Sequence, residues 1–216
     1  IHCCAALKPK TIPPVRAPTT TICAIIRLSQ IIDLFYSVSL YANRAQIQSI
    51  REIFMAISTG ERLPDATLFE VGPDGHQRVF LQDKLRGRKV VIFAVAGAFA
   101  DICNLSHMPG YMRNMEAFAA KGVDEVICLS VNDPLVMKAW GKATGAFSAG
   151  VTLLADTDSG FTSGTGMNFD FPGDGMIARS KRYAMVVEDG LVLNLQEEIH
   201  AGMCEVSTAT AILAIL

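Results

Sequence analysis

Residues 89–103, KVVIFAVAGAFADIC, join an apolar run to a small-residue loop and a cysteine. The run Lys89–Val95 is rich in β-branched residues and has no polar residue after its first position, which is typical of a central strand covered on both faces. The loop at residues 96–99 (AGAF) follows, and a helical pattern extends from about residue 101 to residue 121. A buried strand followed directly by a loop and a helix indicates an α/β domain.

Further strand signals lie on both sides of this stretch. Short apolar or alternating runs predict strands at residues 67–71, 126–131, 151–155, 183–187 and 191–195. The last two flank Asp189-Gly190, a dipeptide that favours the type I′ turn of a β-hairpin. The chain therefore contains enough strands for a sheet whose ends are joined by helices.

The helix and loop signals are more irregular. Asp133 followed by Pro134 predicts a helix start, because proline fits the first helical position. Pro109 is expected to kink or interrupt the helix that it lies in. A small apolar helix is predicted over residues 206–216, and the glycine-rich segment 156–177 is predicted to be a loop with room for one short helix.

Composition excludes several classes of protein. The chain has 216 residues, of which 50% are apolar, so it can bury a core in one domain or in one domain with an appendage. A net charge of −2 gives no reason to expect nucleic acid as a partner. The sequence contains no run of about 18 uncharged apolar residues, so a membrane-spanning helix is not predicted. Six cysteines without a C-x-x-C pair are too few for a disulfide scaffold and do not indicate structural zinc.

The charge is distributed unevenly. Residues 1–54 contain six basic and two acidic residues, and Met55 is the first of nine methionines. Three interpretations of this leader fit: an organelle transit peptide, sequence upstream of a natural start at Met55, or a structured extension. We expect a poorly ordered leader over residues 1–54 and a domain over residues 55–216. A start at Met55 predicts a cytoplasmic protein, and a transit peptide predicts a plastid or mitochondrial protein.

Cys103 is the cysteine whose position suggests chemistry. It follows a buried strand and a tight loop, and it falls in the first turn of a predicted helix. Helix N-termini stabilise a thiolate, whereas a free thiol with a pKa of about 8.5 is only about 3% thiolate at pH 7. The alternative is a buried, unreactive cysteine, which is a common core residue.

A set of motifs occurs in a characteristic order. They are GAF (97–99) before Cys103, HMPGY (107–111) after it, CLSVND (128–133), Trp140-Gly141, LLAD (153–156) and SKRYAMVVEDG (180–190). With these motifs the chain from about Met55 to its C-terminus resembles the type II peroxiredoxins. The resemblance implies a thioredoxin-like α/β fold, a central mixed β-sheet flanked by helices. It also implies a thiol-dependent peroxidase that reduces hydrogen peroxide and alkyl hydroperoxides without a metal or other cofactor.

The resemblance also implies roles for individual residues. Cys103 aligns with the peroxidatic cysteine, and Arg182 aligns with the arginine that holds the thiolate and the peroxide. His107 matches a position that orders the cysteine's helix, and Gly97 would let the backbone approach the peroxide. The residues alone also allow a solvated Arg182 at a strand start, a structural His107, and a Gly97 that only makes the turn.

Two other cysteines are expected to have different roles, one in redox chemistry and one in the core. Cys204 aligns with the resolving cysteine of the atypical two-cysteine subgroup, and a disulfide with Cys103 would require local unfolding. Without this partner the enzyme would be a one-cysteine type that glutathione, glutaredoxin or thioredoxin reduces directly. Cys128, inside a predicted strand, is expected to be a buried structural thiol.

The active-site loop departs from the family pattern P-x-x-x-T-x-x-C. Ala96 stands where the family has proline, and Ala100 replaces the threonine whose hydroxyl bonds the thiolate and the peroxide. Loss of a hydrogen bond to a charged group costs about 1.5–3 kcal/mol, or roughly 10- to 150-fold in rate. Asp101 adds a negative charge near Cys103. We therefore expect a slowed peroxidase.

Two alternatives from other functional classes remain open. The substitutions at Ala96 and Ala100 also fit a catalytically degenerate peroxiredoxin that acts as a redox sensor or a binding module. Cys103 and Ser106 form a C-x-x-S pattern, which fits a glutaredoxin-like thiol transferase. The resemblance further implies a homodimer, and no nucleic acid or membrane partner is expected.

Overall fold

The computed structural model describes residues 56–200 and 202–216. The described residues belong to one compact unit of the chain. The predicted leader over residues 1–54 and the predicted start at Met55 lie outside the described residues. Within the described residues, no helix is long and apolar enough to span a membrane.

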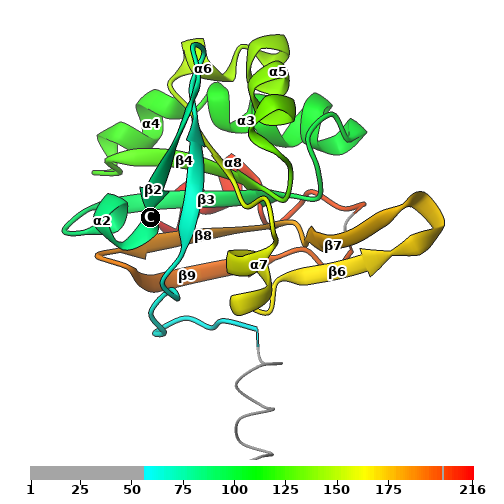
Figure 1. The fold of residues 1–216 in the computed structure, drawn as a ribbon. Coiled ribbons are helices and arrows are strands. Elements are labelled where there is room, and N and C mark those ends of the chain that lie inside the picture. Colours follow the sequence, from blue (N-terminus) through cyan, green and yellow to red (C-terminus); the bar gives the residue numbers. More distant parts are fainter. Residues whose placement is uncertain (1–55, 201) are drawn as a thin grey trace, which may run out of the picture. The chain divides into compact units, whose positions relative to one another are not determined.

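A mixed seven-stranded sheet forms the centre of the described unit (Figure 1). The strands in spatial order are β2 (His76–Phe80), β1 (Thr67–Val71), β5 (Thr152–Ala155), β4 (Glu125–Ser130), β3 (Lys89–Val95), β8 (Tyr183–Glu188) and β9 (Leu191–Glu197). The central strands β3, β4 and β5 are parallel, whereas β1 and β8 run antiparallel to their neighbours β5 and β3. This mixed sheet confirms the predicted fold class.

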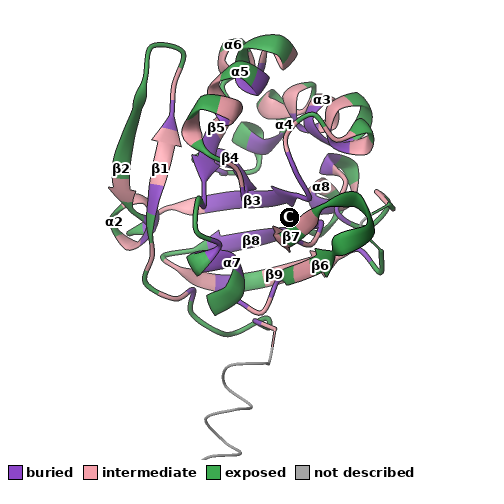
Figure 2. Ribbon diagram, turned by 45° about the vertical axis from the view of Figure 1, so that its right-hand side comes forward, coloured by how far each residue is buried: buried purple, intermediate pink, exposed green. Residues whose placement is uncertain are grey.

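The sequence of β3 explains why it lies in the interior. Its residues 90–95 are all buried, and alternate side chains enter two different core clusters. Val91, Phe93 and Val95 join one cluster, while Val90 and Ile92 join the other on the opposite face. Figure 2 shows β3 and its neighbour β8 as buried strands. The continuous apolar run was therefore correctly interpreted as a doubly covered strand.

Helices cover both faces of the sheet. One face carries α3 (Met108–Met112), α4 (Met115–Ala120), α5 (Pro134–Thr144), α6 (Ala146–Ala149) and α8 (Ala209–Ile215). The other face carries α2 (Leu81–Leu85) and α7 (Gly160–Gly164). Helix α5 begins as predicted, because the Asp133 carboxylate accepts hydrogen bonds from the N–H groups of Leu135 and Val136 and Pro134 follows it.

The hairpin of β8 and β9 also forms as predicted. Asp189 and Gly190 both adopt positive φ, +47° and +77°, as a type I′ turn requires. Three other predictions need correction. The helical stretch is fully interrupted only at residues 113–114, whereas near Pro109, in the first turn of α3, it widens into the π turn Cys103–His107 without ending. The last helix begins only at Ala209, because Thr208 caps it.

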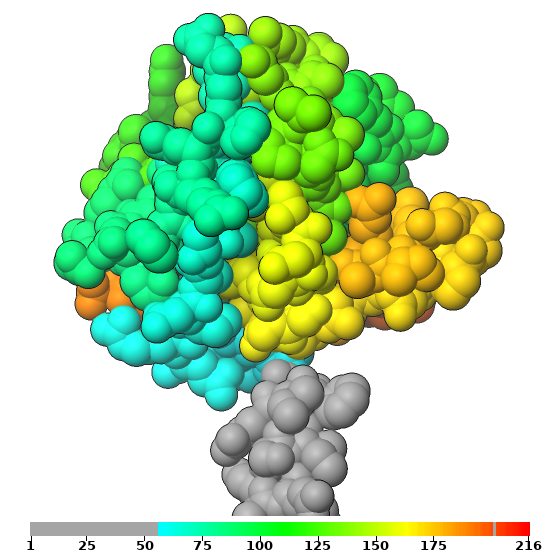
Figure 3. All heavy atoms as spheres, in the orientation of Figure 1, coloured from blue at the N-terminus to red at the C-terminus, as the bar shows by residue number. Residues whose placement is uncertain are grey.

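The third correction concerns the segment predicted to be mainly loop. It contains α7 and also a two-stranded sheet of β6 (Asn168–Phe171) and β7 (Met176–Ser180), joined by a 3₁₀ turn at Pro172–Asp174. This hairpin projects from the rest of the described unit (Figure 3). Most of its strand residues are exposed or half-buried, so the alternation of buried side chains that predicts a strand is weak here.

Candidate active site

Cys103 lies at the start of an unusual helical turn. Residues Cys103–His107 form a π-helical turn in which the Met108 N–H donates to the Cys103 carbonyl oxygen five residues earlier. Because Pro109 has no N–H, it cannot make the regular bond to residue 105, and a widened turn is tolerated at this point. Cys103 and His107 lie four residues apart and both are buried, so they share the inward face.

The sheet brings Arg182 to this turn from far along the chain. Ala94 near the end of β3 pairs with Tyr183 at the start of β8, because the two strands are antiparallel. Arg182, just before β8, therefore lies beside the loop that leaves β3. Its Nη1 is 3.3 Å from Cys103 Sγ and 3.2 Å from His107 Nδ1. The structure thus brings together the predicted cysteine, arginine and histidine.

Burial decides between the two interpretations of Arg182. Its side chain is only 2% exposed, and Cys103 is fully buried, so Arg182 is not a solvated surface residue. A buried guanidinium cation costs free energy unless an anion or strong acceptor compensates it. A thiolate at Cys103 would supply such an anion 3.3 Å away. The arrangement therefore places a buried guanidinium where it can donate a hydrogen bond to the sulfur of Cys103.

The histidine of this cluster is neutral. Burial and the neighbouring Arg182 cation lower the pKa of His107 from 6.5 to about 4. Its ring packs edge-on against Phe93 and Tyr111, with centroid distances of 5.1 and 5.4 Å. His107 therefore contacts the cation as a hydrogen-bond acceptor and not as a second positive charge.

A side chain that follows β4 holds the loop before Cys103. The Ala98 N–H donates to Asn132 Oδ1 at 2.9 Å, and Ser130 Oγ donates to the same oxygen at 2.7 Å. Phe99 adopts a positive φ of +64°, which is rare for an aromatic residue. A side chain at Gly97 would meet only ordinary contacts, the nearest at 3.9 Å, so neither the turn nor the packing requires glycine there.

The positions that depart from the family pattern line a pocket of about 720 Å³ beside the buried cysteine. Ala96, Ala100 and Asp101 form part of its wall, and Arg182 reaches it from β8. The β6–β7 hairpin supplies an apolar wall: Phe169, Phe171 and Met176. The projecting hairpin that the sequence did not predict therefore lines the same pocket as Arg182 and the loop before Cys103.

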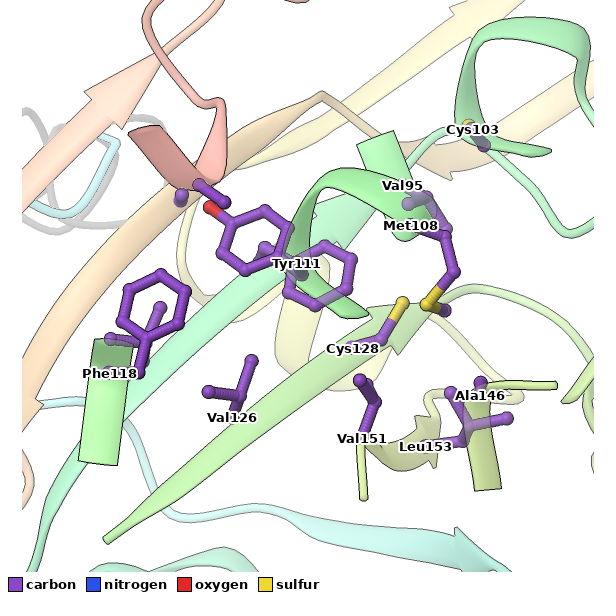
Figure 4. Close-up of a cluster of buried hydrophobic side chains, with 14 of the residues drawn as sticks. Val95, Cys103, Met108, Tyr111, Phe118, Val126, Cys128, Ala146, Val151 and Leu153 are labelled. Atoms are coloured by element: carbon purple, nitrogen blue, oxygen red, sulfur yellow. The ribbon is translucent and has the colours of Figure 1, made fainter. Parts of the chain in front are cut away.

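The other two described cysteines occupy different surroundings. Cys128 is fully buried among apolar side chains (Figure 4), and burial raises its pKa well above the usual value. Cys204 is half-buried and unpaired by a disulfide. Burial raises the pKa of Cys204, and Arg182 opposes the rise.

Sequence reasoning missed three polar residues that support the site: Asn132, Glu198 and Ser207. Asn132 lies in the CLSVND motif, which could have pointed to it. The pair Glu198 and Ser207, nine residues apart, gave no signal, because their contact depends on the path of the chain between β9 and α8. Among the described residues, no group of three or more His, Cys, Asp or Glu is arranged to hold a metal ion.

Comparisons with known proteins place the chain in a family. The Redoxin family matches residues 58–213. Peroxiredoxin-2E-2, chloroplastic, of Oryza sativa subsp. japonica is 41% identical over 151 residues, which are 67% of each chain. Peroxiredoxin-2D of Arabidopsis thaliana is 38% identical over 161 residues, which cover 74% of this chain and 98% of the relative.

A solved structure extends the likeness to three dimensions. The reduced peroxiredoxin of Vibrio vulnificus in complex with hydrogen peroxide superimposes with a TM-score of 0.68 at 41% identity. The match covers 74% of this chain and 98% of that one. Sequence, fold and the Cys103–Arg182 contact lead to one conclusion: the chain belongs to the redoxin family as a peroxiredoxin, a thiol-dependent peroxidase.

Proposed function

We propose that Cys103 is the peroxidatic cysteine and that Arg182 activates it. The Cys103 thiolate attacks one oxygen of the hydroperoxide, the O–O bond breaks, and the alkoxide or hydroxide that leaves takes up a proton. Cys103 becomes a sulfenic acid, and the peroxide is reduced to an alcohol or water. The observation that carries this proposal is the buried guanidinium 3.3 Å from Cys103 Sγ, since it stabilises both the thiolate and the charge that develops on the peroxide.

The pocket supports both small and organic substrates. Hydrogen peroxide can enter the pocket beside Ala96, Ala100 and Arg182, and the apolar side chains of the β6–β7 hairpin can pack against the chain of an alkyl hydroperoxide. Because Ala100 offers no hydroxyl and Ala96 no rigid ring, we propose that turnover is slower than the family motif would allow.

Regeneration of Cys103 is proposed to use one of two thiol routes. Cys204 can attack the sulfenic acid, which forms a Cys103–Cys204 disulfide and releases water, and thioredoxin then reduces the disulfide. Alternatively, glutathione with glutaredoxin reduces the sulfenic acid directly. The first route is supported by the free, half-buried Cys204 thiol, which is more accessible than the fully buried Cys128.

Two features bear on the rival functions. The fully buried Cys103 favours a small peroxide over glutathione as the first substrate, which argues against a thiol transferase of the C-x-x-S type. The paired Arg182 argues against a degenerate site, because a binding module would not require a buried cation at the sulfur.

The assembly and compartment are also proposals. We propose a homodimer, as the family resemblance implies, to be tested by sedimentation at several concentrations. The compartment depends on the leader: a start at Met55 gives a cytoplasmic enzyme, and a cleaved leader gives a plastid or mitochondrial one. One relative, the rice protein, is named as chloroplastic.

Cysteine substitutions test the proposed reaction. Peroxide consumption is measured with either thioredoxin or glutathione and glutaredoxin as reductant. Cys103→Ser should abolish turnover with both reductants, while the matched variant Cys128→Ser should retain it. Turnover that survives in Cys103→Ser would show that another group reduces the peroxide.

A further inference from the structure

Behind the Arg182–Cys103 contact, hydrogen bonds between side chains and backbone groups form a closed circuit. Arg182 Nη1 lies 3.2 Å from His107 Nδ1, and His107 Nε2 lies 3.0 Å from the Ser207 carbonyl oxygen. The Ser207 hydroxyl donates to Glu198 Oε1 at 2.8 Å. The Glu198 N–H donates to the Arg182 carbonyl oxygen at 2.9 Å. The contacts therefore begin at the guanidinium of Arg182 and return to its backbone.

Hydrogen-bond chemistry assigns the proton on His107. A carbonyl oxygen only accepts, so the His107 Nε2 that faces Ser207 O must carry the proton. The Ser207 hydroxyl, 3.4 Å from the same nitrogen, directs its own proton to Glu198. A neutral imidazole has one proton, which leaves Nδ1 as an acceptor for an Arg182 Nη1 N–H. The other N–H of Nη1 is then free to point at Cys103 Sγ.

One carboxylate oxygen of Glu198 holds the segment 205–207, which carries the Ser207 carbonyl that faces His107. Glu198 Oε1 accepts from the Glu205 N–H at 2.7 Å, and from the N–H and the hydroxyl of Ser207, both at 2.8 Å. Both Glu198 and Ser207 are buried. Tyr111 also donates its hydroxyl to the Ser207 carbonyl, at 2.8 Å. The position of this carbonyl is therefore set by the carboxylate on one side and by aromatic donors on the other.

We propose that Glu198 is a positioning residue for peroxide reduction, acting through Ser207 and His107 to aim Arg182 at Cys103. This inference rests on the proposed roles of Cys103 and Arg182. Glu198 also lines the pocket beside Cys103, but its carboxylate oxygen Oε1 is occupied by the hydrogen bonds from Glu205 and Ser207. It fixes the carbonyl that keeps His107 an acceptor, and His107 in turn fixes one of the two N–H bonds of Arg182 Nη1.

The loss of Glu198 has a defined consequence at the sulfur. Without its oxygen, Ser207 loses the acceptor for its N–H and its hydroxyl, and its carbonyl can move away from His107. Nδ1 of His107 can then carry the ring proton, and it no longer accepts from Arg182. The guanidinium loses one of the contacts that direct Nη1 at the sulfur, so it stabilises the Cys103 thiolate and the transition state less well.

Two substitutions at Glu198 distinguish the effect of its hydrogen-bond acceptor from the effects of its size and charge. Glu198→Leu removes the oxygen, and we expect the rate constant of Cys103 with hydrogen peroxide to fall roughly 10- to 100-fold. Glu198→Gln should restore most of the rate, because its amide oxygen can occupy the place of Oε1. The matched control Glu188→Leu removes an exposed carboxylate at the far end of β8 and should leave the rate unchanged.

A second measurement detects the thiolate without peroxide. The full-length chain is alkylated with iodoacetamide across a pH series, and the Cys103 peptide is quantified by mass spectrometry. In Glu198→Leu the alkylation of Cys103 should require a higher pH than in the unchanged protein and in Glu188→Leu. If Glu198→Leu does not fold, Ser207→Ala serves instead. It should shift the profile in the same direction but less, because the Ser207 carbonyl remains.

Each result has one meaning. A folded Glu198→Leu variant with an unchanged rate and an unchanged alkylation profile overturns the proposal, as does a Glu198→Gln variant as slow as Glu198→Leu. An equal loss in Glu188→Leu also overturns it, since the effect would then be general destabilisation. Failure of the proposed function would give a different result: Cys103 of the protein without substitutions would react with peroxide no faster than free cysteine.

Discussion

Acidification from pH 7 to pH 5 should destabilise the folded protein through His107. Burial and the Arg182 cation lower the pKa of this imidazole from 6.5 to about 4. Between these two values the unfolded chain binds a proton that the folded protein does not bind. The contribution of neutral His107 to stability is therefore complete above pH 6.5, falls as the pH falls, and is exhausted below about pH 4.

The magnitude follows from the two pKa values. At about 1.4 kcal/mol per pKa unit, the whole window corresponds to about 3 kcal/mol. About 2 kcal/mol of this is lost between pH 7 and pH 5. Glu198 adds little in this range. Its burial raises its pKa, but hydrogen bonds from Ser207 and Glu205 outweigh that and hold the pKa below the usual 4.5.

Urea unfolding at a series of pH values measures this loss, with the fluorescence of Trp140 as the probe. The free energy of unfolding should fall by about 2 kcal/mol from pH 7 to pH 5 without a change in the urea dependence. His107→Gln, which does not titrate, should remove most of that slope. A stability that is flat from pH 7 to pH 5, or a slope that persists in His107→Gln, would refute the reasoning.

Three further changes have defined outcomes. Ala100→Thr should accelerate the reaction of Cys103 with hydrogen peroxide by about 10- to 150-fold if only the hydroxyl is missing, as stopped-flow kinetics will measure; no gain would mean that the loop geometry differs. Cys204→Ser should leave the first oxidation of Cys103 unchanged but abolish the intramolecular disulfide on a non-reducing gel. A disulfide that persists would exclude Cys204 as the resolving cysteine. Gly141→Ala would place a methyl group 2.5 Å from a Phe147 ring carbon, so it should cost about 1–3 kcal/mol in thermal unfolding; unchanged stability would contradict the packing.

The fold could be predicted wherever burial is expressed in local sequence. Strand β3 has a continuous apolar run because both of its faces are covered, and the β8–β9 turn needs two positive φ values that Asp189-Gly190 supplies. The β6–β7 hairpin could not be predicted in this way. Its strands bury few side chains, so the two-residue period that identifies a strand is nearly absent.

The candidate site was predictable only in part, for a similar reason. Cys103 and Arg182 stand in motifs that resemble a known family, and their meeting follows from the pairing of β3 with β8. Glu198 and Ser207 have no motif of their own. Their contact depends on how the segment after β9 folds back, and the residues of this segment carry no local signal of that path.

The single tryptophan of the chain offers a direct view of the peroxidatic step. Trp140 Nε1 donates to Asn104 Oδ1 at 3.1 Å, and Asn104 is the residue next to Cys103. Oxidation of Cys103 should therefore change the fluorescence of Trp140.

The decisive measurement is stopped-flow fluorescence after the reduced protein is mixed with hydrogen peroxide. If Cys103 is the peroxidatic cysteine, the rate is linear in peroxide concentration, much faster than that of free cysteine under the same conditions, and lost in Cys103→Ser. A rate no greater than that of free cysteine, or one that persists in Cys103→Ser, would contradict this role.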